Sequence, residues 1–190
     1  VCAIDRSQYD GLLPGHSGRF DTSNLGKQDR LCLLQNIALQ DGETMEVDCA
    51  DEGEDGCELC SSDSGCSFGT GSVVRMTAGN IRLPEGSSIG SHMHIELGSN
   101  ATFEIEGGDT SLSGALEGKL KVGGGIVRLS GVSGTADIEV ATGSTLYFEG
   151  NGDTELALNN SGEIVFDGQI GFKSKIMSSG TLTFLDGSEV

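Results

Sequence analysis

Six cysteines are the residues best suited to chemistry in this chain, and all of them lie in its first 66 positions. An even number of cysteines suits three disulfides, although sequence cannot choose among the connectivities. Zinc is the alternative, since Cys57-x-x-Cys60 flanked by Cys49 and Cys66 could supply four thiolates. Two cysteines would then have no role, so we predict that all six are oxidised. They are Cys2, Cys32, Cys49, Cys57, Cys60 and Cys66.

Two histidines and a glutamate form the next group, in the stretch His92-Met-His94-Ile-Glu96. Alternation along a strand would place all three side chains on one face, as a metal site requires. Alternate residues on a face stand roughly 7 Å apart, however, which is too far for two of them to share one zinc without distortion. We therefore interpret this stretch as a solvent-exposed face and predict no metal site.

Carboxylates crowd the run from residue 48 to residue 58 and could supply the oxygen ligands that calcium prefers. The run lacks the spacing of an EF-hand, so an exposed acidic loop held by disulfides is the favoured interpretation. Calcium stays the alternative, and no other cofactor is predicted. The carboxylates are Asp48, Asp51, Glu52, Glu54, Asp55 and Glu58.

Two sequons, Asn100-Ala-Thr and Asn159-Asn-Ser, predict N-linked glycans at Asn100 and Asn159. Together with the disulfides they predict a secreted protein of the cell surface. The chain begins at Val1 with neither Met nor a leader, as expected of a processed protein or a fragment.

The net charge of -18 and the pI near 4.2 argue against nucleic acid and anionic membrane surfaces as partners. No apolar run approaches the roughly 20 residues of a spanning helix, so membrane insertion is not expected. The 31 glycines against 2 prolines, interleaved with β-branched residues, indicate many short strands and tight turns. We therefore predict an all-β fold.

After residue 70 the chain repeats pairs of alternating apolar residues at spacings of about 18 to 25, which is typical of a β-solenoid. Two interleaved sets indicate at least two strands in each rung. The first set is Ile81/Leu83, Phe103/Ile105, Val127/Leu129, Leu146/Phe148, Ile164/Phe166 and Leu182/Phe184. The second set is Ile95/Leu97, Leu120/Val122, Ile138/Val140, Leu156/Leu158 and Ser174/Ile176.

Outward positions in this alignment alternate in charge, as stacked parallel strands favour. Arg75 alone among the basic residues of the repeats finds no place in it. The expected neighbours are Glu96 with Lys121, Lys121 with Glu139, Lys119 with Asp137, Glu155 with Lys173, and Arg82, Glu104 and Arg128 down the first strand.

Handedness follows from rung length. An aliphatic residue at every sixth position from Leu158 to Leu182 favours a left-handed β-helix, but the series stops at Gly152. The longer upstream rungs favour a right-handed one. The stretches Gly162-Glu-Ile-Val-Phe-Asp-Gly168 and Gly180-Thr-Leu-Thr-Phe-Leu-Asp-Gly187 resemble repeats of autotransporter and haemagglutinin-like passenger domains, and the pattern resembles the right-handed parallel β-helices of the pectate-lyase-like superfamily. That resemblance implies fold more than function.

Two regions are predicted. Residues 1–69 form an irregular, disulfide-rich N-terminal cap, and residues 70–190 form a solenoid of about six rungs. The rung opened by Gly180 lacks its second strand at Val190, so we expect either further rungs or a stacked subunit.

The resemblance implies that an enzyme of this superfamily would need an Arg or Lys base beside calcium-binding carboxylates, or clustered aspartates with Gly-His-Gly and Arg-Ile-Lys motifs. None of these motifs occurs, and Gly15-His-Ser-Gly18 is the nearest match. The absence of Trp leaves few platforms for sugar rings. We predict no enzyme but an extracellular structural protein, a β-helical rod of an appendage, filament or adhesin. The alternative is a carbohydrate-binding or carbohydrate-active β-helix.

As partners we predict further copies of this chain, through self-assembly, or other filament subunits. Down the first strand the outward column changes from charged residues to Tyr147, Val165 and Thr183. A less hydrated strip of this kind packs against partners. We therefore expect an interface centred on these three residues.

Overall fold

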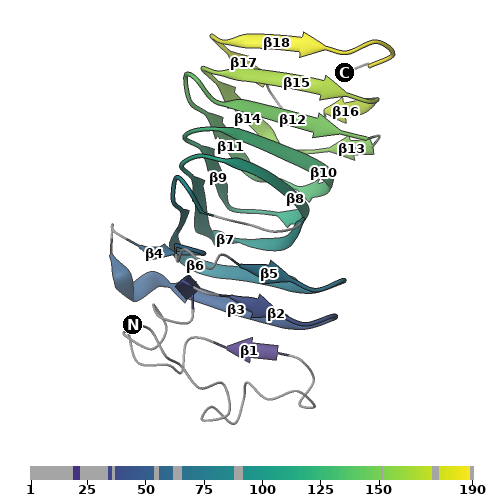
Figure 1. Ribbon diagram of the computed structural model, residues 1–190. Helices are drawn as coiled ribbons and strands as arrows, with labels where there is room; N and C mark the ends of the chain where they lie inside the picture. The colour runs from purple at the N-terminus through teal and green to yellow at the C-terminus, as the bar shows by residue number, and fades with distance from the viewer. Residues whose placement is uncertain are drawn as a thin grey trace.

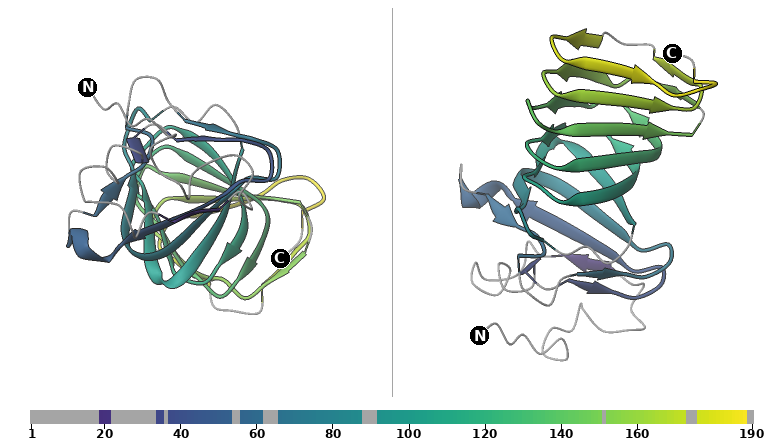
Figure 2. Two further views of the ribbon diagram at one scale, coloured as in Figure 1. Left: turned by 90° about the horizontal axis from the view of Figure 1, so that it is seen from below. Right: turned by 45° about the horizontal axis from the view of Figure 1, so that its top comes forward.

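The computed structural model shows a stack of β-strand rungs that climbs steadily from the N-terminal to the C-terminal end of the chain (Figure 1). It describes residues 19–21, 34–35, 37–53, 56–61, 66–87, 92–150, 152–172 and 176–188. Strand pairing within these residues is parallel throughout, and the rungs surround a common interior when seen from below (Figure 2). The predicted all-β parallel solenoid is confirmed. Its right-handed sense stays a prediction.

The strands differ in length along the stack, with the longest in the middle. A 3-10 helix, η3 (Ala50–Glu52), interrupts the lower part. The lower strands are β1 (Arg19–Asp21), β2 (Ala38–Leu39), β3 (Thr44–Cys49), β4 (Cys57–Glu58), β5 (Ser67–Phe68), β6 (Val73–Leu83) and β7 (Met93–Ile105). The upper strands are β8 (Asp109–Leu116), β9 (Lys119–Val122), β10 (Ile126–Gly134), β11 (Asp137–Val140), β12 (Thr145–Glu149), β13 (Gly152–Thr154), β14 (Ala157–Asn160), β15 (Glu163–Asp167), β16 (Ile170–Phe172), β17 (Ile176–Ser178) and β18 (Thr181–Phe184).

Three columns of stacked strands make up the solenoid. The first column runs through the first parts of β8 and β10 and through β12, β15 and β18. The second column runs through the second half of β7 and through β9, β11, β14 and β17. The third column runs through β3, the first halves of β6 and β7, and the last residues of β8 and β10. Strands β13 and β16 pair with each other in a separate short sheet. Strand β7 is long enough to serve two columns, because its two halves pair with different strands of the next rung.

The predicted alignment is confirmed in the upper rungs. Leu146 pairs with Val127 on one side and with Ile164 on the other, and Ile164 pairs with Leu182. In the second column Leu120 pairs with Ile138. Regular rungs of 18 or 19 residues therefore follow the apolar alternation directly.

The alignment is wrong lower down, where two sets of apolar pairs lie in other columns than expected. Phe103 lies beside Leu120 of the second column and not beside Val127, while Ile95 lies beside Gly114 of β8. The reason is strand β8, whose inward positions include Thr110 and Gly114, so that it lacks a clear apolar alternation. The sequence therefore gave no signal for a whole strand of the first column.

A second, smaller error lies in the pairing of β11 with β14. Ile138 pairs with Leu158, two positions beyond the expected Leu156. Asn160 then takes the inward position after Leu158, where it is 1% exposed. Its side chain donates to the Thr181 carbonyl at 3.1 Å and accepts from the Gly162 amide at 3.0 Å. A polar residue fits this core position because its hydrogen bonds are made.

The core is one continuous set of buried apolar side chains that runs along the stack. Phenylalanines stack in its upper part, with ring centroids 5.7 Å apart between Phe148 and Phe166 and 5.0 Å apart between Phe166 and Phe184. Close stacking of equivalent side chains is the direct consequence of parallel pairing without a shift in register.

Parallel pairing continues below residue 70. Strand β3 pairs with β6, and β1 pairs with β3. The backbone of the predicted cap therefore already follows the stacking of the solenoid. Whether the cap and the rungs are separate domains, and whether rungs continue past Val190, stays a prediction.

Candidate functional site

Outward side chains of the second column alternate in charge from rung to rung. Glu58, Arg82, Glu104, Lys121 and Glu139 occupy successive register positions, and we call this set the second-column ladder. Arg82 Nη2 lies 3.0 Å from Glu58 Oε1, and Lys121 Nζ lies 3.8 Å from Glu104 Oε2. Each exposed pair contributes only a few tenths of a kcal/mol. Together the pairs favour this register over a slip by one rung.

Reversing the charge at Lys121 tests the ladder. Lys121→Glu would place a carboxylate about 4.8 Å from its neighbours Glu104 and Glu139, and we expect a loss of about 0.5–1.5 kcal/mol in the free energy of unfolding. Urea denaturation measures it. Adding Glu104→Lys should restore most of the loss, whereas Glu96→Lys, at the position expected from sequence alone, should not. Rescue by Glu96→Lys alone would overturn this register.

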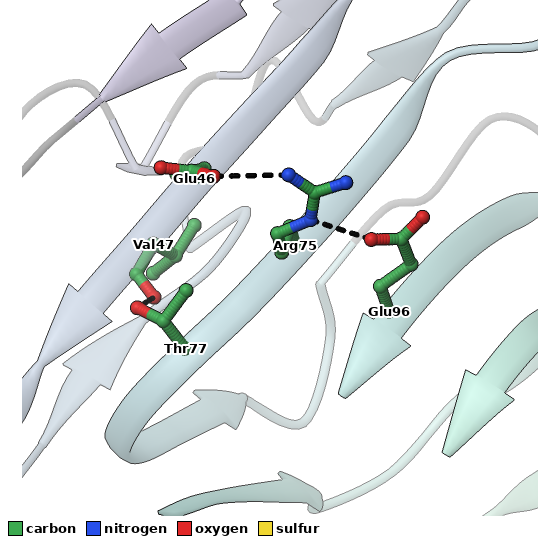
Figure 3. A network of polar contacts seen from close by, with 5 residues as sticks. All are labelled: Glu46, Val47, Arg75, Thr77 and Glu96. Carbon is green, nitrogen blue, oxygen red and sulfur yellow. Dashed lines mark hydrogen bonds and ion pairs between the residues drawn. The ribbon is translucent and has the colours of Figure 1, made fainter. Parts of the chain in front are cut away.

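The third column carries a shorter network around Arg75 (Figure 3). The guanidinium of Arg75 bridges Glu96 on one neighbouring strand and Glu46 on the other, with Nη1 3.0 Å from Glu46 Oε1. These hydrogen bonds, the one to Glu96 first, raise the pKa of Arg75 above its ordinary value. Beside them the Thr77 hydroxyl donates to the Val47 carbonyl at 3.1 Å. Side chains thus tie three successive rungs together.

Arg128 makes an equivalent bridge higher in the stack. It contacts Asp109 at 3.3 Å and Glu149 at 3.4 Å, and its guanidinium carbon lies 4.5 Å from the centre of the Tyr147 ring. The hydrogen bond to Asp109 is the main cause of a raised pKa for Arg128. Arg128 thus links the rung below, which carries Asp109, to the rung above, which carries Glu149.

Several expected charge pairs are therefore corrected. Glu96 meets Arg75 and not Lys121, and Arg75 is not left over. Glu104 lies beside Lys121 and not beside Arg128, because β8 separates the two columns there. The pairings of Lys121 with Glu139 and of Lys119 with Asp137 are confirmed in register. Lys173 lies outside the described residues.

Two shallow grooves are lined in part by outward-facing charged side chains. One, of about 360 Å³, crosses the second column and is lined by Glu104, Lys121, Glu139 and Asn159 together with small residues at the turn. The other, of about 300 Å³, lies where β6 and β7 change column and includes Arg75, Glu96 and Glu117. Acidic and basic side chains therefore do converge in grooves, which the sequence alignment did not predict.

His92, just before β7, and His94, within it, both lie close to one hydroxyl of the next rung. His92 Nε2 lies 2.7 Å and His94 Nδ1 lies 3.0 Å from Ser113 Oγ. Ser113 is the register partner of His94. This serine was missed as a site residue because strand β8 itself was not recognised. No cluster of three or more His, Cys, Asp or Glu suited to a metal ion occurs in the part of the chain that the structure describes.

Four of the six predicted cysteines form two disulfides. Cys49 bonds to Cys57 across η3, with Cα atoms 5.9 Å apart, and Cys60 bonds to Cys66, with Cα atoms 5.4 Å apart. Cys2 and Cys32 lie outside the described residues. Disulfides of this kind suggest an oxidising, extracellular-type environment.

The two disulfides give a prediction for the native protein. Peptide mapping after alkylation without reductant should recover the linked pairs 49–57 and 60–66, with no label on these four cysteines. Each closes a short loop, so replacing either pair by serine should cost about 2–3 kcal/mol in the chain-entropy account. Free thiols at these positions, or a different pairing, would contradict the structure.

Three carboxylates of the acidic run from residue 48 to residue 58 already have a partner or are buried. Asp48 Oδ1 accepts a hydrogen bond from the Ala50 amide at 3.0 Å, Glu58 pairs with Arg82, and Glu52 is buried. Glu54 and Asp55 lie outside the described residues. Calcium binding at this run stays a prediction.

The predicted glycosylation sites are both exposed. Asn100 lies within β7, where the strand changes column, and Asn159 faces outward from β14 at the edge of the 360 Å³ groove. Asn159 therefore lies on a strand face and not at a turn. Their positions suit attachment of a sugar, which stays a prediction.

The predicted interface strip is less open than expected. Tyr147, Val165 and Thr183 are register neighbours on the outer face, but Val165 is only 3% exposed. Val165 therefore offers no open apolar surface in this structure, and the interface itself stays a prediction. Arg128 covers Tyr147, and the Thr183 hydroxyl lies 3.1 Å from Glu163 Oε1.

Exposed apolar side chains gather instead at the last rung. Leu182 is 37%, Phe184 50%, Leu185 41% and Met177 48% exposed, and these four are the large hydrophobic residues that lie open among the described ones. Strand β18 pairs with β15 along one edge. We call this surface the end face.

Comparisons with known proteins reveal no relative of this chain. Searches found no matching protein-family model, no matching curated protein and no matching solved structure. Within the described residues no helix has the length and apolar character needed to cross a membrane. The likeness to pectate-lyase-like and passenger-domain β-helices therefore stays a resemblance, and what the structure shows is a parallel β-solenoid with disulfides in its N-terminal region.

Proposed function

We propose that this chain is an extracellular structural protein, a rigid β-helical rod of a cell-surface appendage, filament or adhesin that acts by assembly. A right-handed helix and passage through a secretory route are part of the proposal. The disulfides support the route, since such bonds persist in oxidising compartments.

The end face is the observation that carries the proposal. The stacked rings of Phe148 and Phe166 continue to Phe184, whose outer side is half-exposed. Leu182 at the same end is the register partner of the fully buried Ile164. The same register positions are buried in the rungs below, whereas the last rung of this sequence leaves these side chains open to solvent. Burying them against a second copy of the chain would recover about 25 cal/mol for each Å² of apolar surface covered.

Ion pairs between neighbouring rungs support a role as a rigid rod. Cations at Arg75, Arg82, Lys121 and Arg128 each contact carboxylates on neighbouring rungs. Local opening of one rung would break contacts to two others, so the stack resists bending by side chains as well as by backbone hydrogen bonds. Stiffness of this kind is what a filament subunit requires.

Concentration-dependent association tests the proposal. Sedimentation equilibrium from low micromolar to submillimolar protein should show self-association of the parent. The double variant Leu182→Lys/Phe184→Lys should stay monomeric, because two charges on the end face cannot be buried without partners. Circular dichroism should be unchanged, since both side chains lie on the exposed end of the stack.

A matched control adds charge elsewhere. Thr142 is exposed at a turn away from the end face, so Thr142→Lys should associate like the parent. A parent that stays monomeric at the highest concentration, or a double variant that associates equally well, would refute assembly through this surface.

Carbohydrate binding is the second candidate, and the 360 Å³ groove favours it. Glu104 and Glu139 flank Lys121 there, as in a site that converges on a polar ligand. The ion pairs of Glu104 with Lys121 and of Glu139 with Lys119 weigh against it, because a ligand would have to compete with contacts already made. Titration with acidic and neutral oligosaccharides, comparing the parent with Lys121→Ala, separates the candidates. Saturable binding lost in Lys121→Ala would favour the second one.

A further inference from the structure

His92 and His94 lie on the same face of the β7 region, on either side of the fully buried Met93. Both imidazoles are exposed, so solvent and small ions can reach them. Neither ring contacts a carboxylate in the described structure; what they share is the Ser113 hydroxyl on the next rung. Two imidazoles therefore converge on one point of the surface.

The distances remove the geometric objection to a shared ion. His92 Nε2 and His94 Nδ1 both lie within 3.0 Å of Ser113 Oγ, so the two nitrogens are less than about 6 Å apart. Alternate residues on a strand stand roughly 7 Å apart. The two ring nitrogens are closer together than that, because both lie within 3.0 Å of the same Ser113 oxygen on β8. A tetrahedral ion with bonds of about 2.0–2.1 Å needs nitrogens about 3.3 Å apart. Small rotations of two exposed side chains supply that difference.

The hydroxyl between the rings is an incomplete substitute for an ion. A serine carries one O–H donor, so it can donate to only one of the two imidazoles at a time. The second ring must adopt the tautomer that donates back to the oxygen. A cation at the same point accepts a lone pair from both neutral rings at once, which no single hydroxyl can do.

The donor set identifies the class of ion. Imidazole nitrogen suits zinc, copper and nickel, whereas calcium and magnesium prefer oxygen ligands. Glu96, the next outward residue of β7, is held by Arg75 and supplies no oxygen to the pair. The overall charge of -18 attracts cations of any kind to the surface, so selectivity must come from the two rings.

We propose that His92 and His94 bind one late first-row divalent ion, zinc or copper, with water completing the coordination and Ser113 as a neighbouring group. Copper binds more tightly than zinc, as the usual order of divalent affinities requires. The proposal is independent of assembly through the end face, because strands β7 and β8 are separated from β18 by β10, β12 and β15 (Figure 1).

Titration of the full chain, prepared without a histidine tag, tests the site. Calorimetry with Zn²⁺ and with Cu²⁺ should give one equivalent bound by the parent. His92→Ala and His94→Ala should each weaken binding about tenfold or more. Ser113→Ala should bind at least as well as the parent, because its hydroxyl occupies the position of the ion. His16→Ala, which alters the remaining histidine of the chain, should bind like the parent.

A spectroscopic measurement distinguishes this site from adventitious binding. In ¹⁵N-histidine-labelled protein, Zn²⁺ should shift the His92 Nε2 and His94 Nδ1 resonances together, at one equivalent, while His16 stays unchanged. Absence of binding to the parent at submillimolar ion, full binding by His92→Ala and His94→Ala, or shifts confined to His16 would each overturn the proposal.

Discussion

Replacing Phe166 with alanine is expected to lower the free energy of unfolding by about 3–5 kcal/mol. The side chain is fully buried and stacks between Phe148 and Phe184. Its removal leaves a cavity that the neighbouring rungs cannot close, because their spacing is fixed by backbone hydrogen bonds on both sides of β15. Chemical denaturation followed by circular dichroism measures the loss.

Phe184 provides the matched control, since it is the same residue type in the same stack. Its side chain is 50% exposed, so Phe184→Ala should cost less than about 2 kcal/mol. The difference between the two variants isolates burial from residue type. Equal losses, or a smaller loss for Phe166→Ala, would mean that Phe166 does not lie in the core.

Gly114→Ala is expected to have an effect of similar size for a different reason. Gly114 occupies an inward position of β8 with φ of +119°, and a Cβ there would lie 1.9 Å from the backbone oxygen of Ile95. Backbone of a paired strand cannot move aside without breaking the rung. We expect a loss of about 3 kcal/mol or more, or failure to fold. Thermal unfolding of the purified variant, or its soluble yield, reports the outcome.

Gly143→Ala is the control that separates the effect of a steric clash from the effect of backbone strain. It also has a positive φ, of +86°, but a Cβ there would meet nothing within 4 Å. Gly143→Ala should therefore show only the conformational cost, about 1–2 kcal/mol. If the two alanine variants unfold at the same temperature, close packing of β8 against β7 is not the reason for glycine at position 114.

Alternation of apolar residues predicted the fold class and the upper register because each strand there has two large inward residues. Leu146, Ile164 and Leu182 repeat at equal spacing and pair as expected. Strand β8 could not be found this way, since Thr110 and Gly114 take inward positions in it. Its omission moved Phe103 and Ile95 into the wrong columns.

The candidate sites were less predictable than the fold, because they depend on contacts between rungs. The role of Arg75 follows from the pairing of β3 with β6, which lies outside the repeats seen in sequence. The burial of Val165 could not be read from the apolar alternation, which placed this residue on the outer face. Ser113 became visible as a partner of the histidines only when β8 was placed beside β7. Oxidation of cysteines, a property of composition, was easier to foresee.

The position of strand β9 tests the stack most directly, since the second-column ladder and the 360 Å³ groove depend on it. Interstrand nuclear Overhauser effects in isotopically labelled protein would locate its neighbours. The stack predicts contacts from the backbone protons of Lys121 to those of Glu104 on one side and Glu139 on the other. Contacts from Lys121 to Glu96 in place of Glu104 would contradict it.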